Sequence, residues 1–398
     1  MQKYLPKHLF PKSINLPSLL ISKKKKDWQD KPISWPDIRK NTQNGHIYLL
    51  VDDRYPIGFT VTATDGYSVK IDGVAYADYN NQTQFSMADW SDYTDTEGYD
   101  ISEPTGASKA HIIDIHSQTE TADITAFHCD RVAASGTEQQ GILWIHFNLN
   151  NQINLNLLSA RSSYYENRIM KAITAKNNLL KVSTSLGSFA FNTQALEYVP
   201  IIDGNNETIN CASMFAGSGV SKVILQNLKI SASSSTYVFY NSKVEDLTFK
   251  NVDTSAVSNF SFFFNLAKNL KKLPNMNYSS ATNISSFLRH NIALEDTVLD
   301  VSAATGLTKI DCDGNDANFM SGFKGLRVSS SAPFNNATSP QINVSYTGMD
   351  RTALVQLFND LPTVSDGQSI NIVGCTGTAD LTAEDELIAT NKGWTITE

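Results

Sequence analysis

The sequence contains no run of about 18 apolar residues, the length that an α-helix needs to cross a membrane. It also lacks a glycine-rich phosphate loop, an HExxH zinc motif and a nucleophile elbow, the short motifs of several common enzyme classes. Only 4 of the 398 residues are cysteine, and their spacing matches no metal-ligand motif. We therefore expect isolated buried thiols, no transmembrane helix, no catalytic residue, no cofactor and no metal.

Charge is scarce and unevenly distributed. Charged residues make up 18% of the chain, whereas Ser, Thr and Asn together number 109, a composition that favours strands and turns over helices. Residues 1–40 contain ten basic and three acidic residues, a net charge of +7, and the remainder contains 22 basic and 37 acidic residues, a net charge of −15. Because the larger part is acidic, broad electrostatic binding of nucleic acid is not expected.

Residues 1–46 are rich in proline and basic residues, and no helical or strand period persists in them. We predict an extended arm that docks on another protein, with a solvated tail as the alternative. The four lysines follow the apolar stretch 16–21, which is the wrong order for a signal peptide. The residues expected to make the docking contacts are Leu9, Phe10, Leu19, Leu20, Lys23, Lys24, Lys25, Lys26, Trp28 and Trp35.

Residues 47–140 contain short runs of β-branched and aromatic residues that are separated by turns. The Asp72–Gly73 pair is a strong turn signal after one such run. Runs at this spacing predict a small β-sandwich. The expected strands cover residues 47–51, 59–63, 67–71, 111–116 and 124–129.

Residues 141–348 contain a repeat with a period of 24 residues, the spacing between successive members of Phe215, Phe239, Phe263 and Phe287. One unit of this length cannot bury its own apolar side, but stacked units can, so the period predicts a solenoid. Asn and Ser at the corners are expected to bond the turn backbone. The predicted repeat core consists of Phe215, Val223, Leu225, Phe239, Leu247, Phe249, Phe263, Leu273 and Phe287.

Residues 349–398 are expected to form a capping unit of helices and strands. Asp350 is a candidate N-cap for a helix over 351–359, and residues 382–385 resemble a capping box for a second helix. Gly393 lies where a helix-terminating glycine is expected. Strands are predicted over 369–373 and 394–397.

Three groups of residues invite a chemical interpretation. On a strand, His111 faces one side while Asp114 and His116 face the other, so the latter two are able to share a metal with a third ligand; a hydrogen-bonded strand face is the simpler interpretation. Residues Asp311–Asn315 begin like a calcium loop but lack the later EF-hand positions, so a repeat corner is the alternative. Acidic residues around Trp90 suit either a carbohydrate-cleaving site or a solvated loop.

The unit ends 209–215, 258–263 and 282–287 match the Thr-Asn-x-Ser-x-Met-Phe phrase of BspA-like leucine-rich repeats, which the solenoid therefore resembles. The C-terminal stretches 353–362 and 388–397 are similar to the end shared by such proteins in tailed bacteriophages. In those proteins the repeats follow an Ig-type PKD-like β-domain, and residues 67–73 keep only that domain's Asp-Gly turn.

The resemblance implies a mainly β protein with some α, built from an extended arm (1–46), an Ig/PKD-like sandwich (47–140), a leucine-rich-repeat solenoid (141–348) and an α/β cap (349–398). It implies a non-enzymatic virion protein, namely a fibre, spike or surface decoration that assembles in the host cytoplasm. Its partners would be other virion proteins, further copies of itself and a host-surface receptor or glycan. The alternatives are a bacterial leucine-rich-repeat surface adhesin and a solenoid polysaccharide depolymerase.

Overall fold

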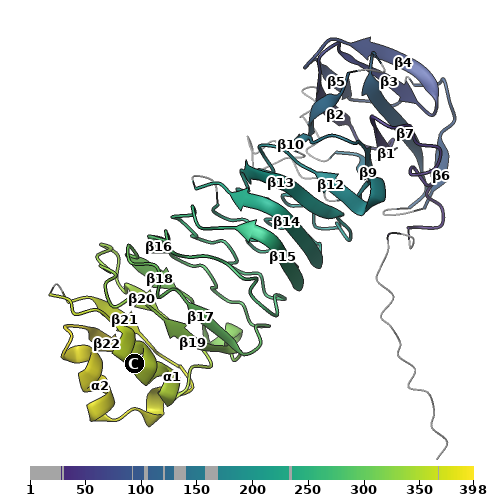
Figure 1. Ribbon diagram of the computed structural model, residues 1–398. Helices are drawn as coiled ribbons and strands as arrows, with labels where there is room; N and C mark the ends of the chain where they lie inside the picture. Colours follow the sequence, from purple (N-terminus) through teal and green to yellow (C-terminus); the bar gives the residue numbers. More distant parts are fainter. Residues whose placement is uncertain are drawn as a thin grey trace, which may run out of the picture.

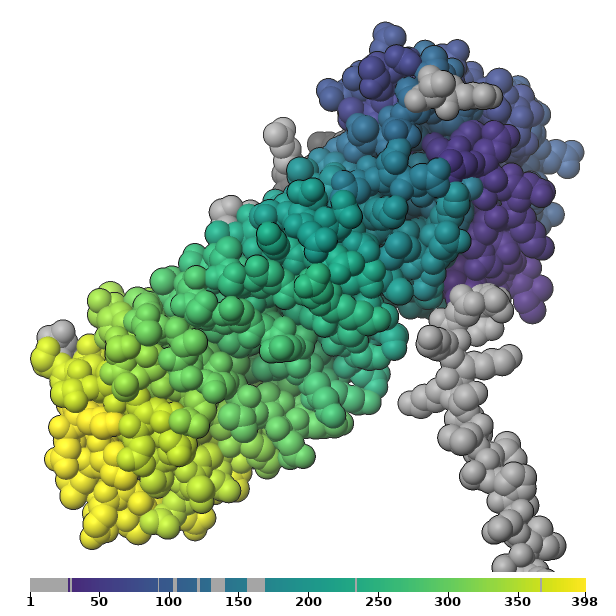
Figure 2. Space-filling model, in the orientation of Figure 1, coloured from purple at the N-terminus to yellow at the C-terminus, as the bar shows by residue number. Residues whose placement is uncertain are grey.

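The computed structural model describes residues 28, 31–91, 93–102, 106–119, 122–129, 140–156, 169–232, 235–365 and 367–398. These residues form a rod that is mainly β, with a two-sheet unit at one end and a β-solenoid of about nine turns extending from it (Figure 1). In space-filling view the two parts merge into one continuous body (Figure 2).

The larger sheet of the two-sheet unit has seven strands. Its order is β11-β9-β1-β7-β3-β4, and β6 also pairs with β7. Alternating residues of β1 face opposite sides, so Ile47 and Leu49 enter the core between the sheets while Tyr48 and Leu50 face outward. The strands are β1 (His46–Asp52), β3 (Tyr67–Ile71), β4 (Val74–Tyr79), β6 (Tyr99–Ile101), β7 (Ser108–Ser117), β9 (Ile142–Asn148) and β11 (Ala172–Ala175).

The smaller sheet has the order β10-β8-β2-β5 and packs its apolar face on the larger one. Phe127 of β8 contacts Phe147 of β9 edge to face, with ring centroids 6.1 Å apart. The strands are β2 (Ile57–Ala63), β5 (Gln84–Met87), β8 (Ile124–Cys129) and β10 (Asn154–Asn156). All five predicted strands of this region are present, and β4, β5 and β6 are additional to them.

Backbone pairing continues from the two-sheet unit into the solenoid through the parallel bridges Ile153–Val182 and Ala172–Tyr198. Strand β9 pairs antiparallel with β1 on one edge and parallel with β11 on the other, and β10 pairs parallel with β8. One apolar core runs from Ile47 to Trp394. No break in backbone pairing therefore marks the predicted boundary after residue 140.

The solenoid consists of parallel strands on two sides of the rod. Val223 pairs with Leu247 and Leu225 with Phe249, so one turn of the coil equals the predicted period of 24 residues. One side contains β12 (Leu179–Lys181), β13 (Ile201–Ile209), β14 (Lys222–Ile230) and β15 (Asp246–Asp253), followed by the pair β17 (Thr297–Asp300) and β19 (Phe323–Arg327). The other side contains β16 (Asn283–Ile284), β18 (Lys309–Asp311), β20 (Ile342–Asn343), β21 (Ser369–Asn371) and β22 (Thr395–Thr397).

Phenylalanine fills the axis of the coil. Phe215, Phe239, Phe263 and Phe287 are each fully buried, and the rings of Phe215 and Phe239 stack with centroids 5.5 Å apart. Most of the predicted repeat core is buried in the same way. Phe249 and Leu273 are exceptions, because they pack against the core while remaining partly exposed.

Asparagine side chains close the corners, as predicted. The Oδ1 atoms of Asn259, Asn283 and Asn371 each accept a hydrogen bond from the backbone N–H two residues later, at 2.9–3.0 Å. These bonds satisfy turn N–H groups that a buried corner would otherwise leave without a partner.

The last residues of the chain contain the helices and strands that were predicted for the capping unit. Strands β21 and β22 extend the parallel sheet, while α1 (Arg351–Asp360) packs against β19 and contacts α2 (Ala383–Thr390). Both predicted helix starts are confirmed, because Asp350 caps α1 and Thr382 forms a capping box with Asp385. Short 3₁₀ turns occupy Lys176–Asn178, Asp316–Asn318 and Thr378–Asp380.

Candidate functional site

The end of the predicted arm covers the outer face of the larger sheet. Trp28, Trp35 and Ile38 are at most 5% exposed and form a second core with Leu50 and Trp144. Trp28 and Trp35 were expected to dock on another protein, but an apolar sheet face of the same chain buries them instead. The other eight residues predicted to dock lie before residue 28, outside the described residues.

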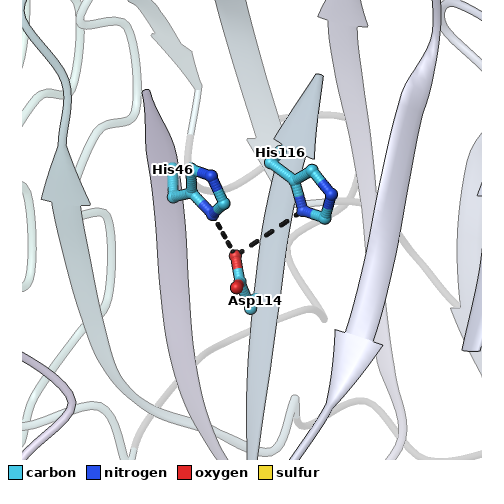
Figure 3. A group of neighbouring side chains, drawn as sticks. All are labelled: His46, Asp114 and His116. Atoms are coloured by element: carbon cyan, nitrogen blue, oxygen red, sulfur yellow. Dashed lines mark hydrogen bonds and ion pairs between the residues drawn. The ribbon is translucent and has the colours of Figure 1, made fainter. Parts of the chain in front are cut away.

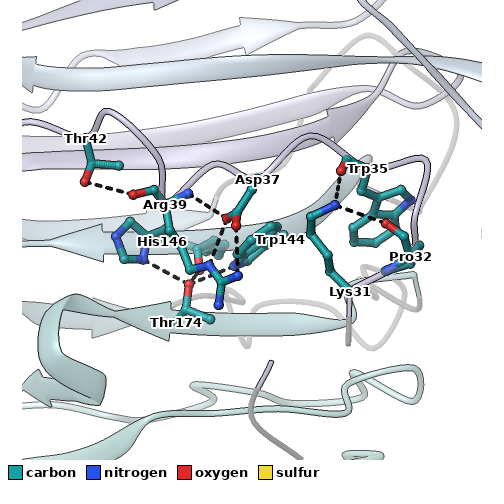
Figure 4. A network of polar contacts seen from close by, with 10 residues as sticks. Lys31, Pro32, Trp35, Asp37, Arg39, Thr42, Trp144, His146 and Thr174 are labelled. Atoms are coloured by element: carbon teal, nitrogen blue, oxygen red, sulfur yellow. Dashed lines mark hydrogen bonds and ion pairs between the residues drawn. The ribbon is translucent and has the colours of Figure 1, made fainter. Parts of the chain in front are cut away.

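A polar network fixes this segment over β9 and β11 (Figure 4). Asp37 accepts a hydrogen bond of 2.8 Å from Arg39 Nε, and the Arg39 guanidinium lies over the Trp144 ring at 5.2 Å. Trp144 Nε1 donates to Thr174 Oγ1 at 2.8 Å, and His146 Nδ1 lies 3.0 Å from the same hydroxyl. Burial, together with the charge of Arg39, lowers the pKa of His146 to about 4, so this imidazole is neutral at pH 7.

Three asparagines on the outer surface of the solenoid bond one another. Asn251 Nδ2 donates to Asn206 Oδ1 at 3.2 Å and to Asn227 Oδ1 at 3.1 Å, which joins three successive turns. All three asparagines have φ between 50° and 64°, a conformation that Asn tolerates better than most residues. These three amides form a short asparagine ladder across three turns of the rod.

A shallow hollow crosses several turns on the solenoid surface. Its volume is about 390 Å³, and amide, hydroxyl and ammonium groups dominate its lining. The polar lining residues include Gln194, Ser218, Asn241, Ser242, Lys268 and Asn269. Groups of this kind hydrogen-bond hydroxyl-rich ligands.

The region that resembles a calcium loop is a repeat corner with its own cations. Asp313 lies 3.3 Å from Arg289 Nε, and Asp311 lies 3.9 Å from Lys309 Nζ. Burial raises the pKa of Asp311 to about 6. The side-chain oxygen of Asn315 caps the 3₁₀ turn, because it accepts a hydrogen bond from the Asn318 N–H.

Trp90, in the acidic segment, belongs to the apolar core of the two-sheet unit. Trp90 is buried and stacks on His111, with ring centroids 4.8 Å apart. His111 Nδ1 lies 2.7 Å from Asp72 Oδ2, and Asp72 also accepts from the Ile112 N–H. Asp100 pairs with Lys109 at the surface. Asp92 and Glu103 lie outside the described residues.

Asp114 and His116 share one face of β7, opposite to His111, as the alternation predicted. His46 from β1 joins them, and its Nδ1 lies 2.6 Å from Asp114 Oδ1 (Figure 3). Burial raises the pKa of Asp114, but the neighbouring imidazoles of His116 and His46 outweigh burial and lower it overall. Sequence reasoning missed His46, because it lies 68 residues before Asp114 and only strand pairing brings the two together.

The four cysteines are free and buried, as expected. In the part of the chain that the structure describes, no helix is long and apolar enough to cross a membrane. No family model matches the sequence, and no curated protein or solved structure is significantly similar to it.

Proposed function

We propose that this chain is a non-enzymatic structural protein of a bacteriophage virion, namely a fibre, spike or surface decoration. In this proposal the two-sheet unit is an Ig/PKD-like domain, and the solenoid is an array of BspA-like leucine-rich repeats. The observation that carries the proposal is a rod whose core runs unbroken from the two-sheet unit to the last strand. Such a rod holds a binding surface away from its point of attachment.

The proposed contact surface is the part of the solenoid surface that contains the asparagine ladder and the polar hollow. The asparagine ladder and the polar hollow offer amide, hydroxyl and ammonium groups for hydrogen bonding, which suit a host-surface glycan or a polar protein surface. The acidic body keeps such a projection soluble.

Anchoring is assigned to the residues before Trp28. Trp28 and Trp35 are excluded from the anchor, because they cover the outer face of the larger sheet. A deletion of residues 1–40 would remove both tryptophans and expose that face, so it would not test anchoring alone. Residues 1–27 still contain Leu9, Phe10, Leu19, Leu20 and the four consecutive lysines.

The test uses phage particles that are purified from lysates of cells carrying the gene. It measures how many copies of the protein each particle contains. We expect the full chain in the particles and loss of incorporation for a chain that lacks residues 2–27, with circular dichroism unchanged. A second variant with Ser at positions 23–26 separates the contribution of the lysines from that of the apolar residues.

Two results would contradict the proposal. Normal copy number of the shortened chain would disprove anchoring by residues 2–27. Absence of the full chain from particles, with antibody labelling of intact uninfected cells, would favour the bacterial adhesin instead.

A further inference from the structure

Three potential metal ligands converge on the outer face of the larger sheet. Strands β1 and β7 are antiparallel neighbours in which Ile47 lies opposite Ile115, so His46 and His116 are cross-strand neighbours. Asp114 precedes His116 by two residues and therefore projects from the same face. Figure 3 shows the two imidazoles on either side of the carboxylate.

The ligand atoms lie close enough to bind one ion. His46 Nδ1 is 2.6 Å and His116 Nδ1 is 3.8 Å from Asp114 Oδ1, and one ligand atom from each of the three residues lies within 4.8 Å of the others. With zinc–ligand bonds of about 2.0–2.2 Å, tetrahedral geometry places ligand atoms roughly 3.3–3.5 Å apart. The observed distances lie on both sides of that value. The planes of the two imidazoles are 12° apart, so both rings must also rotate until the ion lies in each ring plane.

One of these three ligand atoms is a buried polar atom without a hydrogen-bond partner. His116 Nδ1 is buried and makes no hydrogen bond, because 3.8 Å to the carboxylate is too long for one. A buried polar atom without a partner costs about 1–3 kcal/mol. The imidazoles of His46 and His116 stack with centroids 4.7 Å apart, so both rings keep their Nδ1 edges near Asp114.

We propose that His46, Asp114 and His116 bind one divalent transition-metal ion, with Zn²⁺ as the preferred ion. Two imidazole nitrogens favour zinc over calcium or magnesium, which prefer all-oxygen sites. Three protein ligands leave a coordination position for water or for a ligand from a partner. The ion joins the start of β1 to β7, and this inference does not depend on the proposed virion function.

Calorimetric titration of the full-length, chelator-treated protein with Zn²⁺ at pH 7.5 tests the site. We expect one ion per chain. The variants His116→Gln and Asp114→Asn remove a ligand with little change in volume, and each is expected to weaken binding more than about 100-fold. Loss of an outer hydrogen-bond partner alone costs 10–100-fold at known metal sites.

His290→Ala is the matched control, because His290 lies in the solenoid beside Asn315 and is expected to bind zinc no differently from the wild type. Absorption of bound Co²⁺ supplies a second measurement, since two imidazoles and a carboxylate produce d–d bands that weak surface binding does not. If the wild type binds no stoichiometric zinc, the three residues form only a hydrogen-bonded cluster and the proposal is overturned. Wild-type affinity in His116→Gln or Asp114→Asn overturns it as well.

Discussion

At the residue scale, His146 links the arm segment to the stability of the larger sheet. Its folded pKa of about 4 lies below the ordinary value of 6.5, because burial disfavours the imidazolium. Between these values the unfolded chain binds a proton that the folded chain does not, so the wild type loses stability as the pH falls from 6.5 to about 4.

Replacement of His146 with Gln removes this dependence. When the pH is lowered from 7 to 4, we expect the free energy of unfolding of the wild type to fall by about 2–3 kcal/mol more than that of His146→Gln. Urea unfolding at both pH values measures the shift. Parallel losses of stability in the two proteins would show that His146 is not responsible.

Asp311 should have the opposite pH dependence. It pairs in register with Asn343, and Asn343 pairs with Asn371, so a carboxyl occupies a corner where the next two turns have an amide. Burial raises the pKa of Asp311 to about 6 from 3.8. In this interval the folded chain holds the extra proton, so the contribution of Asp311 to stability is lost as the pH rises through 6.

The variant Asp311→Asn is therefore expected to stabilise the protein at pH 7.5 by about 1–3 kcal/mol and to have little effect at pH 4. Thermal unfolding at the two pH values measures this difference. Because His146 and Asp311 act in overlapping pH ranges with opposite sign, only the single variants reveal either effect. Destabilisation of equal size at both pH values would mean that the contact of Asp311 with Lys309 dominates.

Sequence reasoning at this scale succeeded where the relevant neighbours are local. The N-cap role of Asp350 and the opposite faces of His111 and Asp114 depend on spacings of a few residues. His46 was missed because its partners come from a distant strand. Trp28 and Trp35 were assigned to a partner because apolar residues among lysines do not reveal which surface covers them.

At the element scale, the repeat period predicts which phenylalanines carry the solenoid. Phe239 is fully buried and its ring contacts Phe215, Phe263 and Phe264 in neighbouring turns. Phe239→Ala should therefore cost about 3–5 kcal/mol, because the cavity cannot collapse without moving adjacent turns. Guanidinium unfolding followed by circular dichroism measures this cost.

Phe262 supplies the control, because it is only partly buried and stacks on the exposed Tyr237 with centroids 4.7 Å apart. Phe262→Ala is expected to cost about 1 kcal/mol, the contribution of one aromatic pair near the surface. Equal costs for the two variants would contradict the assignment of Phe239 to the axis of the coil.

Elements with strong local patterns were the ones that sequence predicted. Short runs of β-branched and aromatic residues located β1, β2, β3, β7 and β8, and caps located both helices. β4 was missed because its residues are mostly exposed, so they carry no apolar alternation. β5 and β6 have only four and three residues, too short for a period to show.

At the scale of the whole molecule, the solenoid was predictable from the sequence, but its junction with the two-sheet unit was not. A period in the sequence indicates stacked turns, whereas nothing in it shows that β9 pairs with β1 on one edge and with β11 on the other. The two-sheet unit thus serves as the first rows of the solenoid and protects its otherwise open end.

This continuity predicts that the two parts unfold together. Four of the five tryptophans, Trp28, Trp35, Trp90 and Trp144, lie in the arm segment and two-sheet unit, and Trp394 lies at the far end. In a Trp394→Phe background, tryptophan fluorescence therefore reports only on the first part of the chain. Adding Phe239→Ala, which lies in the solenoid, should lower the fluorescence midpoint as much as the circular dichroism midpoint, because one core and the parallel bridges between the two parts couple them. An unchanged fluorescence midpoint would instead show that the two-sheet unit folds independently, as separate domains do.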